Sequence, residues 1–150
     1  MDYHENAQWY RVRGDYYCKV KQDAKESYTS FAQGLRIFED LRKAQKISPC
    51  TNELYFLFRM GEIKQELLLL DPAKKLYKRY LQTCPNNTTK EALQVTMNLA
   101  WVFTSLKSHS EAETHFRHHM VSLAKYFRSD SHPMVNRARA RLADCLEMQG

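Results

Sequence analysis

The sequence predicts an all-α protein of about seven helices. Three observations support this prediction: apolar residues recur at helical spacing along the whole chain, helix-capping or helix-stopping residues stand between these segments, and no stretch alternates apolar and polar residues as a half-buried strand does. The 150 residues include only 4 glycines and 4 prolines, and no Asn-Gly or Asp-Gly pair typical of a β-hairpin.

Two helices are predicted in the first third of the chain. The first runs from about Asn6 to Val20. A capping box at Asp23 and Glu26 begins the second, which continues to about Lys46. The residues expected to face inward are Trp9, Val12, Tyr16 and Val20 in the first helix, and Ala24, Tyr28, Phe31, Leu35 and Phe38 in the second.

A proline-containing break separates the second and third helices. It covers Ile47 to Thr51, after which Thr51 or Asn52 is expected to cap a third helix over roughly residues 53–69. Asp71 and Pro72 then provide an N-cap and a first-turn proline for the fourth helix. Its predicted inward residues are Ala73, Leu76, Tyr77, Tyr80 and Leu81.

Three more helices follow, each with its own start signal. Capping boxes at Thr88 and Ser108 begin the fifth and sixth helices, and Pro133 begins a seventh that ends near Met148. The predicted inward residues are Ala92, Val95, Leu99, Phe103 and Leu106 in the fifth helix, and Ala112, Phe116, Met120, Leu123 and Phe127 in the sixth.

Length, charge and cysteine usage limit the class of protein. A chain of 150 residues suits one domain, and its net charge of +6 permits an acidic partner or RNA. The polar N-terminus lacks a signal peptide, and the longest apolar run, Leu67 to Leu70, is too short to span a membrane. We therefore expect a cytoplasmic or nuclear protein that is not inserted in a membrane. The scattered cysteines favour reduced thiols over disulfides or a zinc knuckle; they are Cys18, Cys50, Cys84 and Cys145.

One group of residue types recurs with the same spacing in several of the predicted helices. Leu99, Ala100 and Phe103 return as Leu142, Ala143 and Leu146, and a small residue followed by an aromatic one recurs in the helices between. The pairs or sets involved are Ala112 with Phe116; Gly61 with Ala73, Tyr77, Tyr80 and Pro85; and Trp9, Val12 and Tyr16 with Ala24 and Tyr28. This pattern resembles the tetratricopeptide repeat, and the entry Ser131-His132-Pro133 is similar to the longer repeats of kinesin-light-chain-type proteins. Two positions depart from the pattern: Arg13 stands at a small-residue position and Lys64 at an aromatic one.

The resemblance implies a right-handed solenoid of antiparallel helix pairs in one domain, residues 1–150. Its units would cover about 6–46, 52–87 and 91–128, with a partial unit over 133–150. Because the last unit lacks its second helix, we expect a segment of a larger protein, and self-association through this truncated repeat is one consequence.

The same resemblance implies a scaffold or adaptor that binds a peptide or partner helix in a concave groove. The groove-facing candidates are Tyr10, Tyr17, Phe58, Glu62, Gln65, Met97, Trp101, Ser105, Arg137 and Asp144. Trp101 is the foremost candidate anchor for a partner side chain, although burial in a contact between neighbouring units explains it equally well.

Two basic patches support an alternative, an RNA- or anion-binding helical module. They are Lys74, Lys75, Lys78 and Arg79 in the fourth helix, and Arg137, Arg139 and Arg141 in the seventh. A solvated helix surface is the simpler explanation of both. Arg137 and Arg141 lie one turn apart, where like charges repel, and this favours an acidic partner for them.

No motif for catalysis or for a cofactor is present in the sequence. The four glycines stand too far apart for a phosphate-binding loop, and the sequence His-Glu-x-x-His does not occur. His115, His118 and His119 lie close together with Glu111, but a polar helix face, with His119 turned inward, explains them more simply than a metal site does. We therefore expect no enzyme activity, no cofactor and no bound metal.

Overall fold

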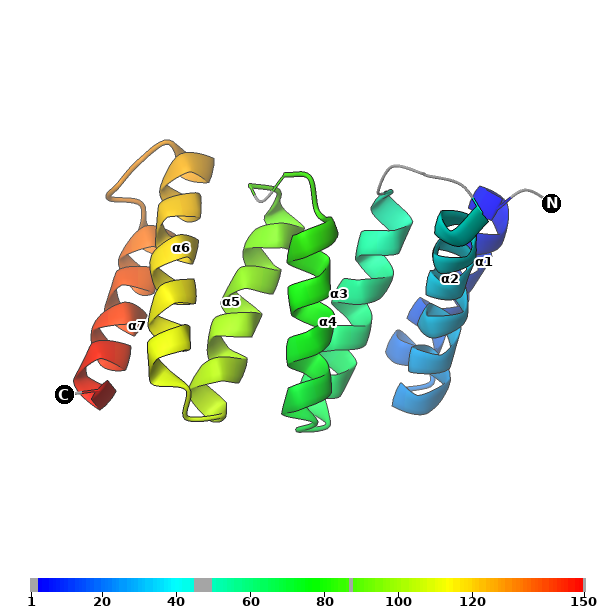
Figure 1. Ribbon diagram of the computed structural model, residues 1–150, viewed down its shortest axis with the longest axis horizontal. Coiled ribbons are helices and arrows are strands. Elements are labelled where there is room, and N and C mark those ends of the chain that lie inside the picture. Colours follow the sequence, from blue (N-terminus) through cyan, green and yellow to red (C-terminus); the bar gives the residue numbers. More distant parts are fainter. Residues whose placement is uncertain (1–2, 45–49, 87, 150) are drawn as a thin grey trace. The chain divides into compact units, whose positions relative to one another are not determined.

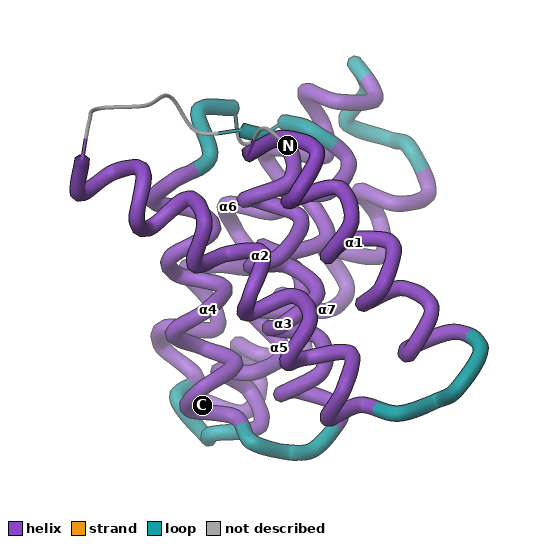
Figure 2. The backbone as a smooth tube through the Cα atoms, turned by 90° about the vertical axis from the view of Figure 1, so that its right-hand side faces the viewer, coloured by secondary structure: helices purple, strands orange, loops and turns teal. Residues whose placement is uncertain are grey.

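The computed structural model describes residues 3–44, 50–86 and 88–149, which contain seven α-helices and no strand (Figures 1 and 2). The all-α prediction is therefore confirmed for this part of the chain. The predicted proline break lies largely outside the described residues, at 45–49. The helices are α1 (Tyr3–Lys19), α2 (Ala24–Ala44), α3 (Thr51–Glu66), α4 (Leu70–Thr83), α5 (Lys90–Ser105), α6 (His109–Phe127) and α7 (Pro133–Gln149).

The helices form two compact units. Unit 1 is Met1–Leu69 and contains α1 to α3; unit 2 is Leu70–Gly150 and contains α4 to α7. The two helices of the predicted pair 52–87 therefore belong to different units. A single continuous right-handed solenoid stays a prediction.

In unit 1, α1 packs on α2 through its smallest residues (Figure 1). Ala7 and Gly14 are the buried residues of α1, and the Ser27 hydroxyl donates a hydrogen bond of 2.8 Å to the Gly14 carbonyl. A Cβ atom built on Gly14 would lie 2.3 Å from the Phe31 ring. Gly14 is therefore a point of close approach between the two helices.

The predicted inward stripe of α1 is wrong. Trp9, Val12, Tyr16 and Val20 are all exposed, because the buried face is the one that carries Ala7 and Gly14. The prediction assumed that Arg13 occupied the small-residue position. Gly14 occupies it instead, and one residue turns a helix by about 100°.

The rest of the unit 1 core is mainly aromatic, and three of the five inward residues predicted for α2 lie in it, whereas Ala24 and Tyr28 are only half-buried. Phe31, Leu35 and Phe38 are buried, and the Phe56 ring of α3 lies about 6 Å from both phenylalanine rings, at 6.1 and 6.3 Å. Gly34 of α2 lets α3 approach, since a Cβ atom there would meet the Phe56 ring at 2.5 Å.

The capping predictions have mixed outcomes. Asp23 caps α2 as predicted, accepting a hydrogen bond from the Glu26 amide at 3.1 Å. Neither Thr51 nor Asn52 caps α3: Thr51 is its first residue, and the N-cap residue is Cys50, which makes no side-chain capping bond. The α5 cap is Thr89, one residue after the predicted Thr88.

Other helix starts also differ from the predictions. The fourth helix begins at Leu70, so Asp71 lies in its first turn and is not its cap. Ser108 is the N-cap residue of α6, as predicted, but its side chain makes no capping hydrogen bond.

In unit 2, α5 packs between α4 and α6, and α6 packs between α5 and α7. Because α5 has neighbours on several sides, it is the most fully buried helix of this unit, with Leu99, Ala100 and Phe103 in its centre. Ala112 and Phe116 of α6 are also buried, as predicted. The buried residues of α7 are Val135, Ala138, Leu142 and Cys145, whereas Ala143 and Leu146 are exposed.

The turns after α3 and α5 have the same backbone form. In each, three successive amides donate to carbonyls of the last helical turn, and the middle residue has a positive φ: 60° at Leu68 and 61° at Lys107. This left-handed conformation is a common way to end a helix. The two turns are the clearest repeated feature in the described backbone.

Candidate functional site

The surface of unit 2 between α5 and α7 is hollowed into three pockets. Their volumes are about 280, 170 and 130 Å³. The first two share Met97, His119 and Met134, and the last two share Arg141, so they follow one another along the same face. We call the three together the α5–α7 groove; α6 contributes to its wall through residues such as His119 and Phe116.

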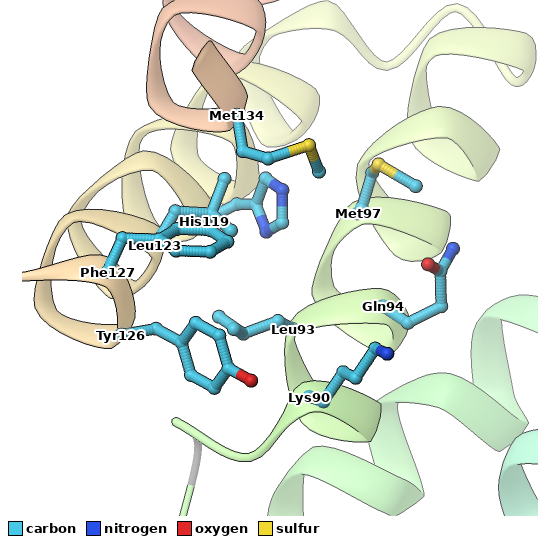
Figure 3. A pocket seen from close by; sticks show the side chains of 9 residues that line it. All are labelled: Lys90, Leu93, Gln94, Met97, His119, Leu123, Tyr126, Phe127 and Met134. Atoms are coloured by element: carbon cyan, nitrogen blue, oxygen red, sulfur yellow. The ribbon is translucent and has the colours of Figure 1, made fainter. Parts of the chain in front are cut away.

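The largest of these three pockets is lined mainly by apolar and aromatic side chains (Figure 3). Met97 of α5 and Met134 of α7 face one another across it, and the His119 ring of α6 lies between them. The Tyr126 hydroxyl and the Lys90 ammonium supply polar groups at the other end of the pocket. The remaining lining residues are Leu93, Gln94, Leu123 and Phe127.

Two arginines of α7 lie against the methionines. Arg141 Nη1 is 3.3 Å from Met97 Sδ, and Arg137 Nη1 is 3.8 Å from Met134 Sδ. Among the described residues, neither guanidinium forms an ion pair with a carboxylate. Thioether sulfur is only a weak acceptor, so both arginines retain most of their capacity to bind an anion.

The smallest pocket contains the exposed indole of Trp101. Its ring makes an edge-on contact with Phe116 of α6, with a centroid distance of 5.9 Å, and Arg141 Cζ lies 5.0 Å from its centre. Trp101 is nevertheless 39% exposed. Trp101 was predicted either to anchor a partner side chain or to be buried within the chain, and neither role alone describes this geometry. One edge of the ring packs within unit 2, and the rest of the ring lines the groove.

His119 is the one buried titratable group that lines two of the pockets. It is 5% exposed, and its Nδ1 has no hydrogen-bond partner among the described residues. Burial, and to a smaller extent the electrostatic effects of Arg141 and His118, together lower the pKa of His119 to about 4. The imidazole is therefore neutral at pH 7, and the charges around the groove come from Lys90, Arg137, Arg141 and Asp144.

The structure brings together four of the predicted groove residues. Met97, Trp101, Arg137 and Asp144 all line the α5–α7 groove. Ser105 is exposed at the end of α5 and lines none of its pockets.

The predicted groove residues of unit 1 are arranged differently. Tyr10 lines a pocket between α1 and α2, and Tyr17 lies beneath the Arg13 guanidinium. On α3, Glu62 forms an ion pair of 2.6 Å with Arg59, whose Nη2 also donates to Cys18 Sγ. The half-buried Phe58 and Gln65 lie on the same helix. One groove through all ten predicted residues stays a prediction.

The structure divides the predicted basic patch of α7. Arg137 and Arg141 line the groove, while Arg139 lies outside it and donates to Asn136 and to the Asp130 carbonyl. This division follows from the helical repeat, because residues two apart point in nearly opposite directions.

The basic patch of α4 is partly used within unit 2. Lys74 pairs with Asp71 at 3.3 Å, and the Lys78 ammonium lies 5.3 Å from the centre of the Phe103 ring. Lys75 is exposed, and the Arg79 side chain interacts with other groups of the protein.

Of the nine residues that line the pocket of about 280 Å³, only Met97 is among the predicted groove residues. Lys90, Tyr126, Phe127 and Met134 are not among the predicted groove residues, although Phe127 was expected in the core. Tyr126 comes from the end of α6, a helix that the repeat frame assigns to the core. The signal available was Tyr126-Phe127, two adjacent aromatic residues at the end of α6.

The three neighbouring histidines do not converge. His115 stacks on Phe103 with a centroid distance of 5.0 Å, His119 faces the groove, and His118 is exposed. Burial lowers the pKa of His115 as well, with smaller effects from His118 and Lys78. Within residues 3–44, 50–86 and 88–149, no three His, Cys, Asp or Glu side chains are grouped so that they could hold a metal ion.

None of the described helices has the length and apolar character needed to cross a membrane. Comparison of the chain with models of known protein families gives no match, and comparison with curated proteins gives none either.

Proposed function

We propose that this chain is a protein-binding scaffold and that the α5–α7 groove of unit 2 binds an apolar side chain of a partner segment with acidic residues beside it. The observation that carries the proposal is the placement of Arg137 and Arg141 on methionine sulfurs at the edge of an apolar groove. In this role the chain acts by binding rather than by catalysis.

The shape of the groove favours a peptide or helix over a small molecule. Three modest pockets in a row suit successive side chains of one segment better than a single compact ligand. Met97 and Met134 are flexible and polarisable, as is common at surfaces that accommodate varied apolar groups. Trp101 provides a large, partly fixed aromatic surface, the residue type most enriched at binding hot spots.

The charge around the groove favours an acidic segment. Lys90, Arg137 and Arg141 carry three positive charges, and Asp144 carries the one negative charge among the charged lining residues. A carboxylate brought beside Arg141 would gain a charge-assisted hydrogen bond, replacing a weak contact with sulfur. We therefore expect Arg137 and Arg141 to select for Asp or Glu next to the apolar anchor.

Selection from a displayed peptide library tests this proposal. The intact chain should enrich peptides that combine an apolar or aromatic residue with Asp or Glu. Arg141→Gln and Trp101→Ala should each weaken a selected peptide by about tenfold or more. The matched control is Arg139→Gln, which removes a charge from the same helix outside the groove. Enrichment without acidic residues, or an equal effect of Arg139→Gln, would argue against the groove.

The alternative partner is RNA or another polyanion. It draws on the same arginines and on exposed Lys75, and a salt titration distinguishes it from an acidic peptide. RNA affinity should fall steeply with salt, in proportion to the number of phosphates neutralised. A peptide held mainly by its apolar anchor should respond far less, because burial of apolar area does not depend on ion screening.

A further inference from the structure

A second surface, in unit 1, is separate from the groove. Three large apolar side chains, Trp9, Val12 and Tyr16, stand in a row along the outer side of α1, and Val20 directly follows the helix; the four are 44–65% exposed. From Trp9 to Val20 the row covers about 16 Å, at the helical rise of 1.5 Å per residue. Contiguous exposed apolar side chains of this size mark interaction surfaces more often than isolated ones do. We call this row the α1 stripe.

The stripe lies on the side of α1 that faces away from α2. Ala7 and Gly14, on the opposite side, make the close packing with α2. The ring contacts of the stripe come from residues close by in the sequence: the Trp9 ring lies 5.0 Å from the Tyr10 ring, and the Tyr16 ring lies 5.5 Å from the Tyr17 ring. Arg13 Cζ lies 5.8 Å from the Trp9 ring, and Lys21 Nζ lies 6.0 Å from the Tyr16 ring. These contacts leave the stripe exposed.

Charges at the two ends of the stripe are opposite. Glu5 lies in the first turn of α1, one turn before Trp9 and on the same face. Lys19 lies in the last turn, and Lys21 follows it. The helix dipole has the opposite sign, positive at the N-terminus and negative at the C-terminus, so it partly offsets these side-chain charges. The side-chain charges at the ends of two copies of α1 attract one another only when the two helices run in opposite directions.

The order of residues also suits pairing with a second copy. In an antiparallel pair with its twofold axis between residues 12 and 13, Trp9 faces Tyr16 of the other copy, and Glu5 reaches the segment that holds Lys19 and Lys21. The same residue pairs then form at both ends of the contact, as a twofold interface requires. A parallel pair would place Glu5 beside Glu5 and lysine beside lysine, which is unfavourable.

We propose that the α1 stripe binds the same stripe of a second copy of this chain, with the two α1 helices antiparallel. A single pair of helices covers less than the standard interface of about 1,600 Å². The dimer should therefore be weak, with a dissociation constant on the order of 1–100 µM. This inference does not depend on the groove of unit 2 and differs from self-association through the last repeat.

Sedimentation equilibrium of the whole chain, at concentrations from about 1 to 500 µM, measures the association. The unmodified chain should be in reversible monomer–dimer equilibrium. Val12→Arg, at the centre of the stripe, should leave only monomer, because two added cations would meet at the twofold axis. Lys25→Glu, on the exposed side of α2, is the control and should not alter the dissociation constant.

Charge exchange tests the direction of the helices. Glu5→Lys alone, and Lys19→Glu with Lys21→Glu, should each weaken the dimer by about tenfold, because attraction becomes repulsion at both ends. All three substitutions together restore opposite charges in the antiparallel pair and should return the affinity to within about threefold. Far-ultraviolet circular dichroism confirms that each variant is folded.

Three results would overturn the proposal: a monomer at every concentration, a dimer that Val12→Arg does not disrupt, or a triple variant that stays as weak as the single exchanges. The last result would exclude the antiparallel arrangement even if the stripe itself associates.

Discussion

Arg141 connects the two walls of the α5–α7 groove: its guanidinium carbon lies 5.0 Å from the centre of the Trp101 ring while Nη1 contacts Met97 Sδ. Arg141 comes from α7, and both of its contacts come from α5. A cation over an indole stabilises by about 0.5–1 kcal/mol at a partly exposed site. The same side chain therefore fixes the position of Trp101 and presents a positive charge to a ligand.

Arg141→Gln should lower the free energy of unfolding by about 0.5–1 kcal/mol and shift the Trp101 fluorescence to longer wavelength as the indole becomes more hydrated. Trp9 is the other tryptophan, so the fluorescence is measured in a Trp9→Phe background. Urea denaturation gives the stability. Arg139→Gln serves as the control, and an equal spectral shift in that variant would show that Arg141 does not hold the indole.

Gly14→Ala should destabilise unit 1 by about 1–3 kcal/mol, because the new Cβ would lie 2.3 Å from the Phe31 ring in a packed core. The sign is informative, since Gly→Ala inside a helix otherwise stabilises by about 1 kcal/mol. Thermal and urea denaturation measure the effect.

A companion variant tests the cause of that effect. Phe31→Leu removes the ring that the methyl group would meet, so it should reduce the additional cost of Gly14→Ala in the double variant. Full additivity of the two substitutions would contradict the close approach at Gly14.

The α1 register shows where sequence reasoning succeeds and where it fails. Helix positions follow from periodicity and breaks, and all seven described starts lie within three residues of their predicted positions because these signals are local. Which face of α1 is buried depends on the partner helix. The large residues Trp9 and Tyr16 suggested an apolar face, whereas contact with α2 requires the smallest side chains, at Ala7 and Gly14.

The candidate site, too, could be predicted from the sequence only in part. Met97 and Trp101 follow from the register of α5, whose buried residues match the repeat pattern closely. His119 was expected to turn inward, and it does, but no local pattern shows that its ring reaches a pocket shared with α7. Met134 and Tyr126 line that surface only because α6 and α7 pack side by side, a tertiary contact that helical spacing does not contain.

Thr89→Ala should lower the stability of unit 2 by about 1 kcal/mol, because the Thr89 hydroxyl accepts a hydrogen bond from the Ala92 amide at the start of α5. Ser108→Ala is a matched comparison at the start of α6. Ser108 has the N-cap position but makes no side-chain bond, so its removal should cost less than about 0.5 kcal/mol. Urea denaturation of both variants measures the difference, and equal losses would show that the described capping bond is not the cause.

Acidification should destabilise unit 2 through His119. Burial, followed by the charges of Arg141 and His118, lowers the pKa of His119 from 6.5 to about 4 in the folded chain. Between these two values the unfolded chain binds the proton more tightly than the folded chain does. Stability therefore falls as the pH falls from about 6.5 to 4, by up to about 3 kcal/mol, and this contribution is constant above and below that window.

Urea denaturation at pH 7, 5.5 and 4.5 measures this slope. His119→Phe keeps an aromatic ring beside Leu123 and removes the titrating group, so it should flatten most of the pH dependence in the window. Burial also lowers the pKa of His115, so His115 should account for a smaller slope of the same sign. Carboxylates that titrate below about pH 5 are common to both chains and cancel in the comparison. An unchanged slope in His119→Phe would show that the imidazole takes up its proton without cost, and thus that it is better solvated than its 5% exposure indicates.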